Sequence, residues 1–190
     1  MPLYNPGTWP PPVDNITSLS NVVPSYSTLP RYLVAGSQSV MTSQSLLVAA
    51  APIPGGSVIT NLGFYTGGTA AITPANWWMV LLSSARVVLG VTADQLTTAI
   101  GSFAKFSLAL GTPVTVPGSA SQLTFTYIGL MVNAGTVPSL EGGNAFTLPQ
   151  QAPAVQGYSS TGQTTPPALA ATMGSIGAAA TAAMPYFFAD

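Results

Sequence analysis

The chain has 190 residues, of which 47% are hydrophobic and only 4% are charged, and its formal net charge is −1. Because it contains no Cys and no His, the sequence excludes a disulfide framework, thiolate chemistry and His-based catalysis. Its three basic residues cannot form the cationic surface that binds nucleic acid. No apolar run reaches the roughly 18 residues of a membrane-spanning helix, so we expect no membrane insertion.

Residues 1–30 hold seven of the eighteen prolines, a density that disfavours helices and central strands. We expect an extended N-terminal arm there, without the basic and apolar regions of a secretion signal. The arm carries apolar side chains that a solvated linker does not need. The assembly or partner-binding residues that this predicts are Leu3, Tyr4, Trp9, Ile16 and Leu19. Docking on a neighbouring subunit and packing against the chain's own domain both fit the pattern.

Residues 31–137 show the alternation of apolar and polar residues that is typical of short strands. Gly and Pro clusters such as residues 52–56 and 67–68 separate the strands and indicate turns. This spacing favours an all-β fold, an antiparallel, jelly-roll-like β-sandwich, over an alternating α/β fold. The strands that we expect cover residues 39–51, 58–66, 77–82, 86–91, 104–110, 113–117 and 122–134.

The strand at residues 122–134 (QLTFTYIGLMVNA) is the most regular of these. Leu123, Phe125 and Tyr127 point to one side of it, and both sides are apolar from residue 128 to residue 132. The run at residues 77–82 (WWMVLL) has the same two-sided character. The predicted core residues are Trp77, Leu81, Phe106, Phe125, Tyr127 and Leu130.

Trp77 and Trp78 are adjacent, so on a strand they face opposite sides. We expect one of them in the core, and the order of the residues does not decide which. Trp78 is the candidate for contact with a glycan or a partner, because Trp is favoured where an apolar face meets a polar ligand. Burial of both in a two-sided sheet is the alternative.

Residues 138–190 are rich in Pro, Gly, Gln and Thr and predict a largely irregular segment. The run MPYFFAD at residues 184–190 is strongly apolar. Left in water, these aromatic residues would form an adhesive patch. We therefore expect a final strand that packs back on the core.

The acidic residues do not indicate a catalytic site, since only Asp14, Asp94, Glu141 and Asp190 are present and no local motif joins them. A glycosidase needs two carboxylates that flank one bond, and calcium sites gather several in one loop. The glycine pairs look like turns and not like a phosphate-binding loop. We therefore predict no enzymatic activity, no cofactor and no metal.

Several segments taken in order resemble a β-sandwich module of minor tail proteins from phages that infect Actinobacteria. The resemblance covers the chain from residue 23 to its end, and its motifs are turns, core positions and strand ends. The segments are VPSYSTLPRY (23–32), PIPGGSVITNLGF (52–64), NWW (76–78), LSSARVVL (82–89), AD (93–94), TTA (97–99), YIGLMV (127–132), TVPSL (136–140) and PYFF (185–188).

The resemblance implies a virion structural protein, most specifically a minor tail protein at the tail tip or fibres. It would assemble with other virion proteins through the arm, form a homo-oligomer in the particle and contribute to adhesion to a host-surface glycan. The low charge agrees with a surface that meets partners, although Ser, Thr, Asn and Gln could also keep it hydrated. A capsid decoration protein or head fibre is the alternative, and a free carbohydrate-binding module is the second alternative.

Overall fold

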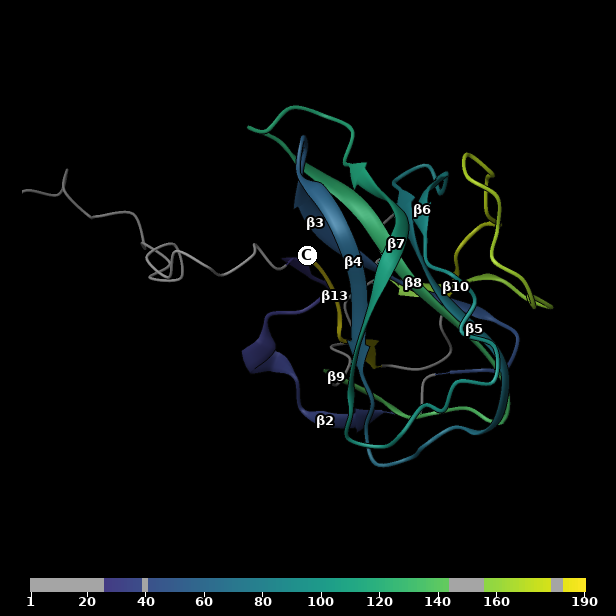
Figure 1. Ribbon diagram of the computed structural model, residues 1–190. Coiled ribbons are helices and arrows are strands. Elements are labelled where there is room, and N and C mark those ends of the chain that lie inside the picture. Colours follow the sequence, from purple (N-terminus) through teal and green to yellow (C-terminus); the bar gives the residue numbers. More distant parts are fainter. Residues whose placement is uncertain (1–25, 39–40, 144–155, 179–182) are drawn as a thin grey trace, which may run out of the picture.

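A computed structural model describes residues 26–38, 41–143, 156–178 and 183–190, and Figure 1 shows how their strands form two facing layers. All strand pairs among these residues are antiparallel. The described residues include one 3₁₀ turn, Arg31–Leu33, and no α-helix. The predicted all-β antiparallel sandwich is therefore confirmed. None of the described residues forms a helix long and apolar enough to cross a membrane.

The smaller layer is a four-stranded sheet that includes the end of the chain. In order across the sheet, its strands are β1 (Tyr26–Ser27), β13 (Phe187–Ala189), β4 (Val58–Tyr65) and β7 (Lys105–Thr115). Strand β7 lies at the edge, which explains why Pro113 is tolerated in it. We expected separate strands at residues 104–110 and 113–117, but the structure has one strand there. The pairing of β4 with β7 shifts register between Ile59 and Asn61.

The larger layer is a six-stranded sheet with β8 at its centre. In order, its strands are β11 (Gly177–Ala178), β10 (Gln156–Ser160), β3 (Leu46–Pro54), β8 (Leu123–Thr136), β5 (Ile72–Ser83) and β6 (Val88–Val91). A third sheet contains β12 (Met184–Pro185), β9 (Leu140–Gly143) and β2 (Gly36–Gln38). The described part of residues 138–190 is therefore richer in strands than its composition predicts, because each short segment pairs with a distant strand.

Between the two large sheets lies the main core, which takes alternate residues from each strand. On β8 the inward side chains are Ile128, Leu130 and Val132, and all three are completely buried. Phe187 of β13 enters the same core, and it pairs with Phe64 of β4. Burial of each such side chain contributes about 1.5–3 kcal/mol. The end of the chain is thus part of the core that holds the sheets together.

The outer face of the six-stranded sheet carries a second core. Its side chains lie on β3, β5 and β8 and point away from the four-stranded sheet. Met173 packs on this core, and residues 170–173 form backbone hydrogen bonds with Val88 and Arg86 beside β6. The buried members are Leu46, Val48, Ala50, Trp78, Val80, Leu82, Val88, Tyr127, Met131 and Met173. One segment of the chain therefore covers much of a sheet face that would otherwise meet water.

Candidate assembly surface

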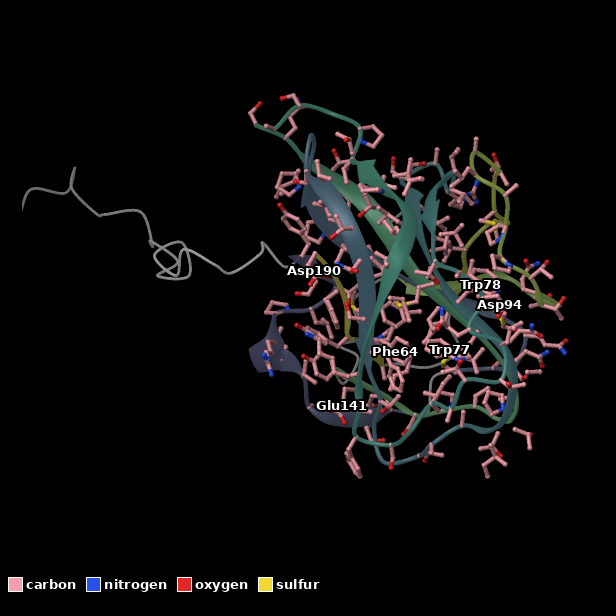
Figure 2. The ribbon with its side chains drawn as sticks, in the orientation of Figure 1. Phe64, Trp77, Trp78, Asp94, Glu141 and Asp190 are labelled. Carbon is pink, nitrogen blue, oxygen red and sulfur yellow. The ribbon has the colours of Figure 1, made fainter. Side chains whose placement is uncertain are left out.

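The structure places most of the predicted core residues in the interior. Trp77, Leu81 and Leu130 lie between the sheets and are almost completely buried. Phe106 is half-buried, and its ring stacks on Phe64 with ring centroids 5.0 Å apart. The Trp77 ring meets the Phe64 ring edge-on at 5.9 Å, and Figure 2 shows these two side chains side by side. Trp77, Phe64 and Phe106 thus form an aromatic cluster between the two sheets.

Trp78 is completely buried, so it is not a surface contact for a glycan or partner, and the other expectation, burial of both tryptophans in a two-sided sheet, is the one that the structure shows. It does point away from Trp77, as the alternation requires, but the face that it joins is the covered outer core. Trp77 Nε1–H donates to the Thr98 carbonyl at 2.9 Å, whereas Trp78 Nε1 has no hydrogen-bond partner among the described residues. The two tryptophans thus lie in two different cores.

The prediction that Phe125 lies in the core is also wrong, because 52% of its surface is exposed. Phe125 and Tyr127 share one face of β8, as expected, but this is the outer face. Tyr127 lies in the outer core and is buried, whereas Phe125 lies beyond the part that the chain covers. The alternation thus predicted correctly that the two side chains share a face, but it did not predict which of them other residues would bury.

An exposed apolar strip begins where the cover of the outer core ends. On β8 it contains Leu123 and Phe125, which are 68% and 52% exposed. Their partners across β3 are Pro54 and Pro52, which stand on the same face. We call these four residues the Phe125 strip. Sequence reasoning assigned only Phe125 among them, and did so for the wrong reason.

The edge of β3 beside this strip is unsuited to strand addition. Strand β10 pairs with β3 only at residues 46–49, so residues 50–54 have an open edge among the described strands. The Gly55 amide donates to the Gln122 carbonyl, so the backbone nitrogen of residue 55 faces β8. Backbone groups alternate between the two edges of a strand, so the nitrogens of residues 52 and 54 face the opposite, open edge. Both are prolines and offer no N–H group there. A partner at this place would have to bind through side chains on the face.

The opposite end of the sandwich carries a different set of exposed apolar residues. Ile72, Leu96 and Phe103 are 58%, 58% and 78% exposed. Leu96 and Phe103 have φ values of 48° and 49°, and Thr73 next to Ile72 has φ 50°. Bulky residues rarely adopt this left-handed conformation, and such strain is concentrated at functional sites. The loops thus hold large side chains in water at an energetic cost.

Asp94 organises this loop end. Its Oδ1 accepts hydrogen bonds from the amides of Trp77 at 3.2 Å and Leu96 at 3.0 Å, and its Oδ2 accepts one from Asn76 Nδ2 at 2.8 Å. The carboxylate therefore ties the loop after β6 to the middle of β5. The bond from the Leu96 amide, two residues later, has the form of an Asx turn.

The carboxylates do not come together. Figure 2 shows Asp94, Glu141 and Asp190 on separate parts of the molecule. Among the residues that the structure describes, no group of three or more acidic side chains could hold a metal ion. Asp14 lies outside the described residues.

Two of the three basic residues contact aromatic rings on the outer side of the four-stranded sheet. Lys105 Nζ lies 4.9 Å from the Phe188 ring centroid, and Arg31 lies 6.0 Å from that of Tyr65. Tyr65 and Phe188 are themselves 5.7 Å apart. A Cβ at Gly63 would collide with the Phe188 ring, so this glycine provides the space for it. The cluster fixes the end of the chain on β4.

The predicted arm residues Leu3, Tyr4, Trp9, Ile16 and Leu19 lie outside the described residues. The comparisons with known proteins identify no relative: no family model matches the chain, and neither a curated protein nor a solved structure matches it. The candidate surfaces are therefore argued from their own geometry.

Proposed function

We propose that the chain is a structural protein of a phage virion, and most specifically a minor tail protein at the tail tip or fibres. The observation that carries this proposal is a surface with little charge and much exposed apolar area. Only seven of 190 residues are charged, while eight large apolar side chains are exposed among the described residues. Such a surface favours association. The resemblance to modules of phage tail proteins is the reason for placing this association in a phage tail.

The assembly role uses the N-terminal arm and the sandwich as separate parts. The arm binds other virion proteins, and copies of the chain form a homo-oligomer in the particle. The sandwich already has a buried core on each face of its larger sheet, so it has a stable core without help from residues 1–22. The apolar arm residues are then available for partners.

The loop end with Ile72, Leu96 and Phe103 is the part that we assign to contact with the host surface. Its strained backbone holds Phe103 outward, and an exposed aromatic ring can stack on a sugar. Replacement of Phe103 by Ala should reduce binding of the protein to cell-wall glycans of the host. Phe125→Ala, at the other end of the sandwich, is the matched control. Equal binding by both variants and the parent protein would remove this assignment.

A mass-spectrometric inventory of purified virions tests the virion role. We expect the protein in the particles at a copy number like that of tail-tip proteins. A copy number comparable to that of the major capsid protein would favour the capsid decoration protein or head fibre. Absence from particles that contain all other structural proteins would overturn the proposal.

Deletion of residues 1–22 tests whether the arm serves assembly while the sandwich folds without it. We expect circular dichroism and cooperative melting of the truncated protein to stay close to those of the full chain, while its incorporation into particles is lost. A full-length variant with Ser at the five predicted arm residues is the control for length. If the truncated protein unfolds, the arm belongs to its own core. If it is incorporated normally, attachment uses another surface.

A further inference from the structure

The outer face of the six-stranded sheet is only partly covered by the chain itself. Residues 170–173 form backbone hydrogen bonds with Val88 and Arg86, and Met173 belongs to the same outer core as Tyr127. The same face continues along β3 and β8 into the Phe125 strip, which has no such cover among the described residues. Residues 170–173 thus lie beside one part of this face, and the described residues leave the other part open.

The chain enters the described domain at the same end as the strip. Tyr26 shares a hydrogen bond with Ser57 in the turn after β3, at 3.1 Å between the two hydroxyl oxygens. Strand β1 pairs with β13 so that Tyr26 lies opposite Ala189, which in turn pairs with Leu62. Followed backward from Ser27 to Tyr26, strand β1 therefore runs toward the turn between β3 and β4. Tyr26, the first described residue, thus lies at the same end of the sandwich as the strip.

The chemistry of the strip suits a proline-rich segment. The two prolines on β3 remove donors from the open edge, so the occupant cannot be held there as an added strand. What remains is an aromatic ring, a leucine and two pyrrolidine rings on one face. Proline-rich segments dock on such aromatic surfaces in an extended form, with little loss of entropy. Residues 1–25 contain six prolines, at positions 2, 6, 10, 11, 12 and 24.

We propose that the Phe125 strip of one copy receives the N-terminal segment, residues 1–25, of a second copy. The length of the N-terminal segment disfavours docking within one chain. An extended chain places Leu19 about 23 Å and Trp9 about 56 Å from Tyr26, whereas the strip is only three residues, about 10 Å, long. Leu19 and Trp9 of a segment stiffened by proline can therefore reach beyond their own strip to that of a neighbouring copy.

This inference deepens the proposed function by naming the surface that receives the arm. It rests on the assembly role, but it concerns contact between copies of this chain alone. A test on purified full-length protein can therefore fail while the protein is still found in virions. The two proposals are thus distinguished by separate experiments.

Site-directed crosslinking is the direct test, because the chain has no Cys and introduced thiols are unique. One full-length variant carries Ser20→Cys, beside Leu19, and a differently tagged variant carries Leu123→Cys in the strip. A Phe103→Cys chain replaces the second partner as the control, since Phe103 is also exposed but lies at the other end of β4. Equimolar mixtures are treated with a short thiol-specific crosslinker.

We expect crosslinks between the two tagged chains for the Leu123→Cys pair and few for the Phe103→Cys pair. Addition of Phe125→Ser to the strip chain should reduce the yield by roughly tenfold. A doubly substituted Ser20→Cys/Leu123→Cys chain reports docking within one molecule. If that chain crosslinks internally at high dilution while the mixed pair does not, docking occurs in cis and the proposal is overturned. Equal yields at both positions, or none at either, also overturn it.

Discussion

Tyr127 and Phe125 lie two residues apart on the same face of β8, yet one is 2% exposed and the other 52%. The strand continues regularly through both, and its pairing with β3 has no irregularity there. What differs is the cover, since Tyr127 lies in the outer core that Met173 closes and Phe125 does not. An apolar side chain on a two-sided sheet is therefore buried only as far as another segment extends over it.

The largest effect on the covered half should come from Trp78→Ala. Removal of this completely buried ring leaves a cavity between β5 and its cover, and we expect a loss of about 3–5 kcal/mol. Trp78→Phe is the control, because it keeps most of the volume and removes only an Nε1 donor that has no partner among the described residues. Urea unfolding followed by circular dichroism measures both. A loss below that of the Phe variant would show that the outer core is not closed.

Leu130→Ala extends the comparison to the inner face of the same strand. Leu130 is completely buried between the two large sheets, so the variant should lose about 2–5 kcal/mol of unfolding free energy. Chemical denaturation measures this value. A change within about 0.5 kcal/mol, as at a surface site, would contradict the assignment of β8 to the centre of the sandwich.

The cover itself can be weakened through Met173→Ala. Because this side chain lies at the margin of the outer core, we expect a smaller loss of about 1–3 kcal/mol. Exposure of Tyr127 should increase at the same time and can be followed by its fluorescence quenching. Leu169→Ala, in the same segment but 57% exposed, is the matched control and should leave stability nearly unchanged. Similar losses in both variants would mean that residues 169–173 do not cover the sheet specifically.

A pH titration sharpens the contrast between the two aromatic residues, since only Tyr127 ionises. Burial raises the pKa of the Tyr127 hydroxyl above its ordinary value of 10.0, and the Arg86 charge lowers it in part. Its folded state thus holds the proton more tightly than the unfolded state does. The associated stability is fully present below pH 10 and is lost as the pH rises through the folded pKa. Tyr127→Phe should therefore show a shallower decline in unfolding free energy above pH 10, and parallel declines would contradict the shift.

The smallest effect on stability should come from the uncovered half. Phe125→Ser should change the unfolding free energy by no more than about 0.5 kcal/mol, because the ring is largely in water already. Phe103→Ser is the control for an exposed ring at the other end. A loss above about 2 kcal/mol in Phe125→Ser would show that the strip is covered within its own molecule.

The order of residues determined the approximate place of the main strands between residues 46 and 136 and which side chains share a face. Alternation is a local property of extended backbone, so Leu130 could be assigned to a core and Phe125 grouped with Tyr127 from residues 122–134 alone. Low charge and the absence of Cys and His likewise needed no structure. The strand at Phe187–Ala189 follows from the cost of leaving aromatic residues in water.

Only the tertiary structure decided which faces are covered: it overturned the core assignment of Phe125 and decided for burial of Trp78, which the sequence had left open. Trp78 is buried in the outer core, to which Met173, 95 residues later in the chain, also contributes. Phe125 is exposed because the segment around Met173 does not reach it. Pairing across such sequence distances depends on how all strands order themselves into sheets, and hydrophobic periodicity contains no information on that order. For the same reason, the strip that Pro52 and Pro54 form with β8 became visible only once β3 was paired in register.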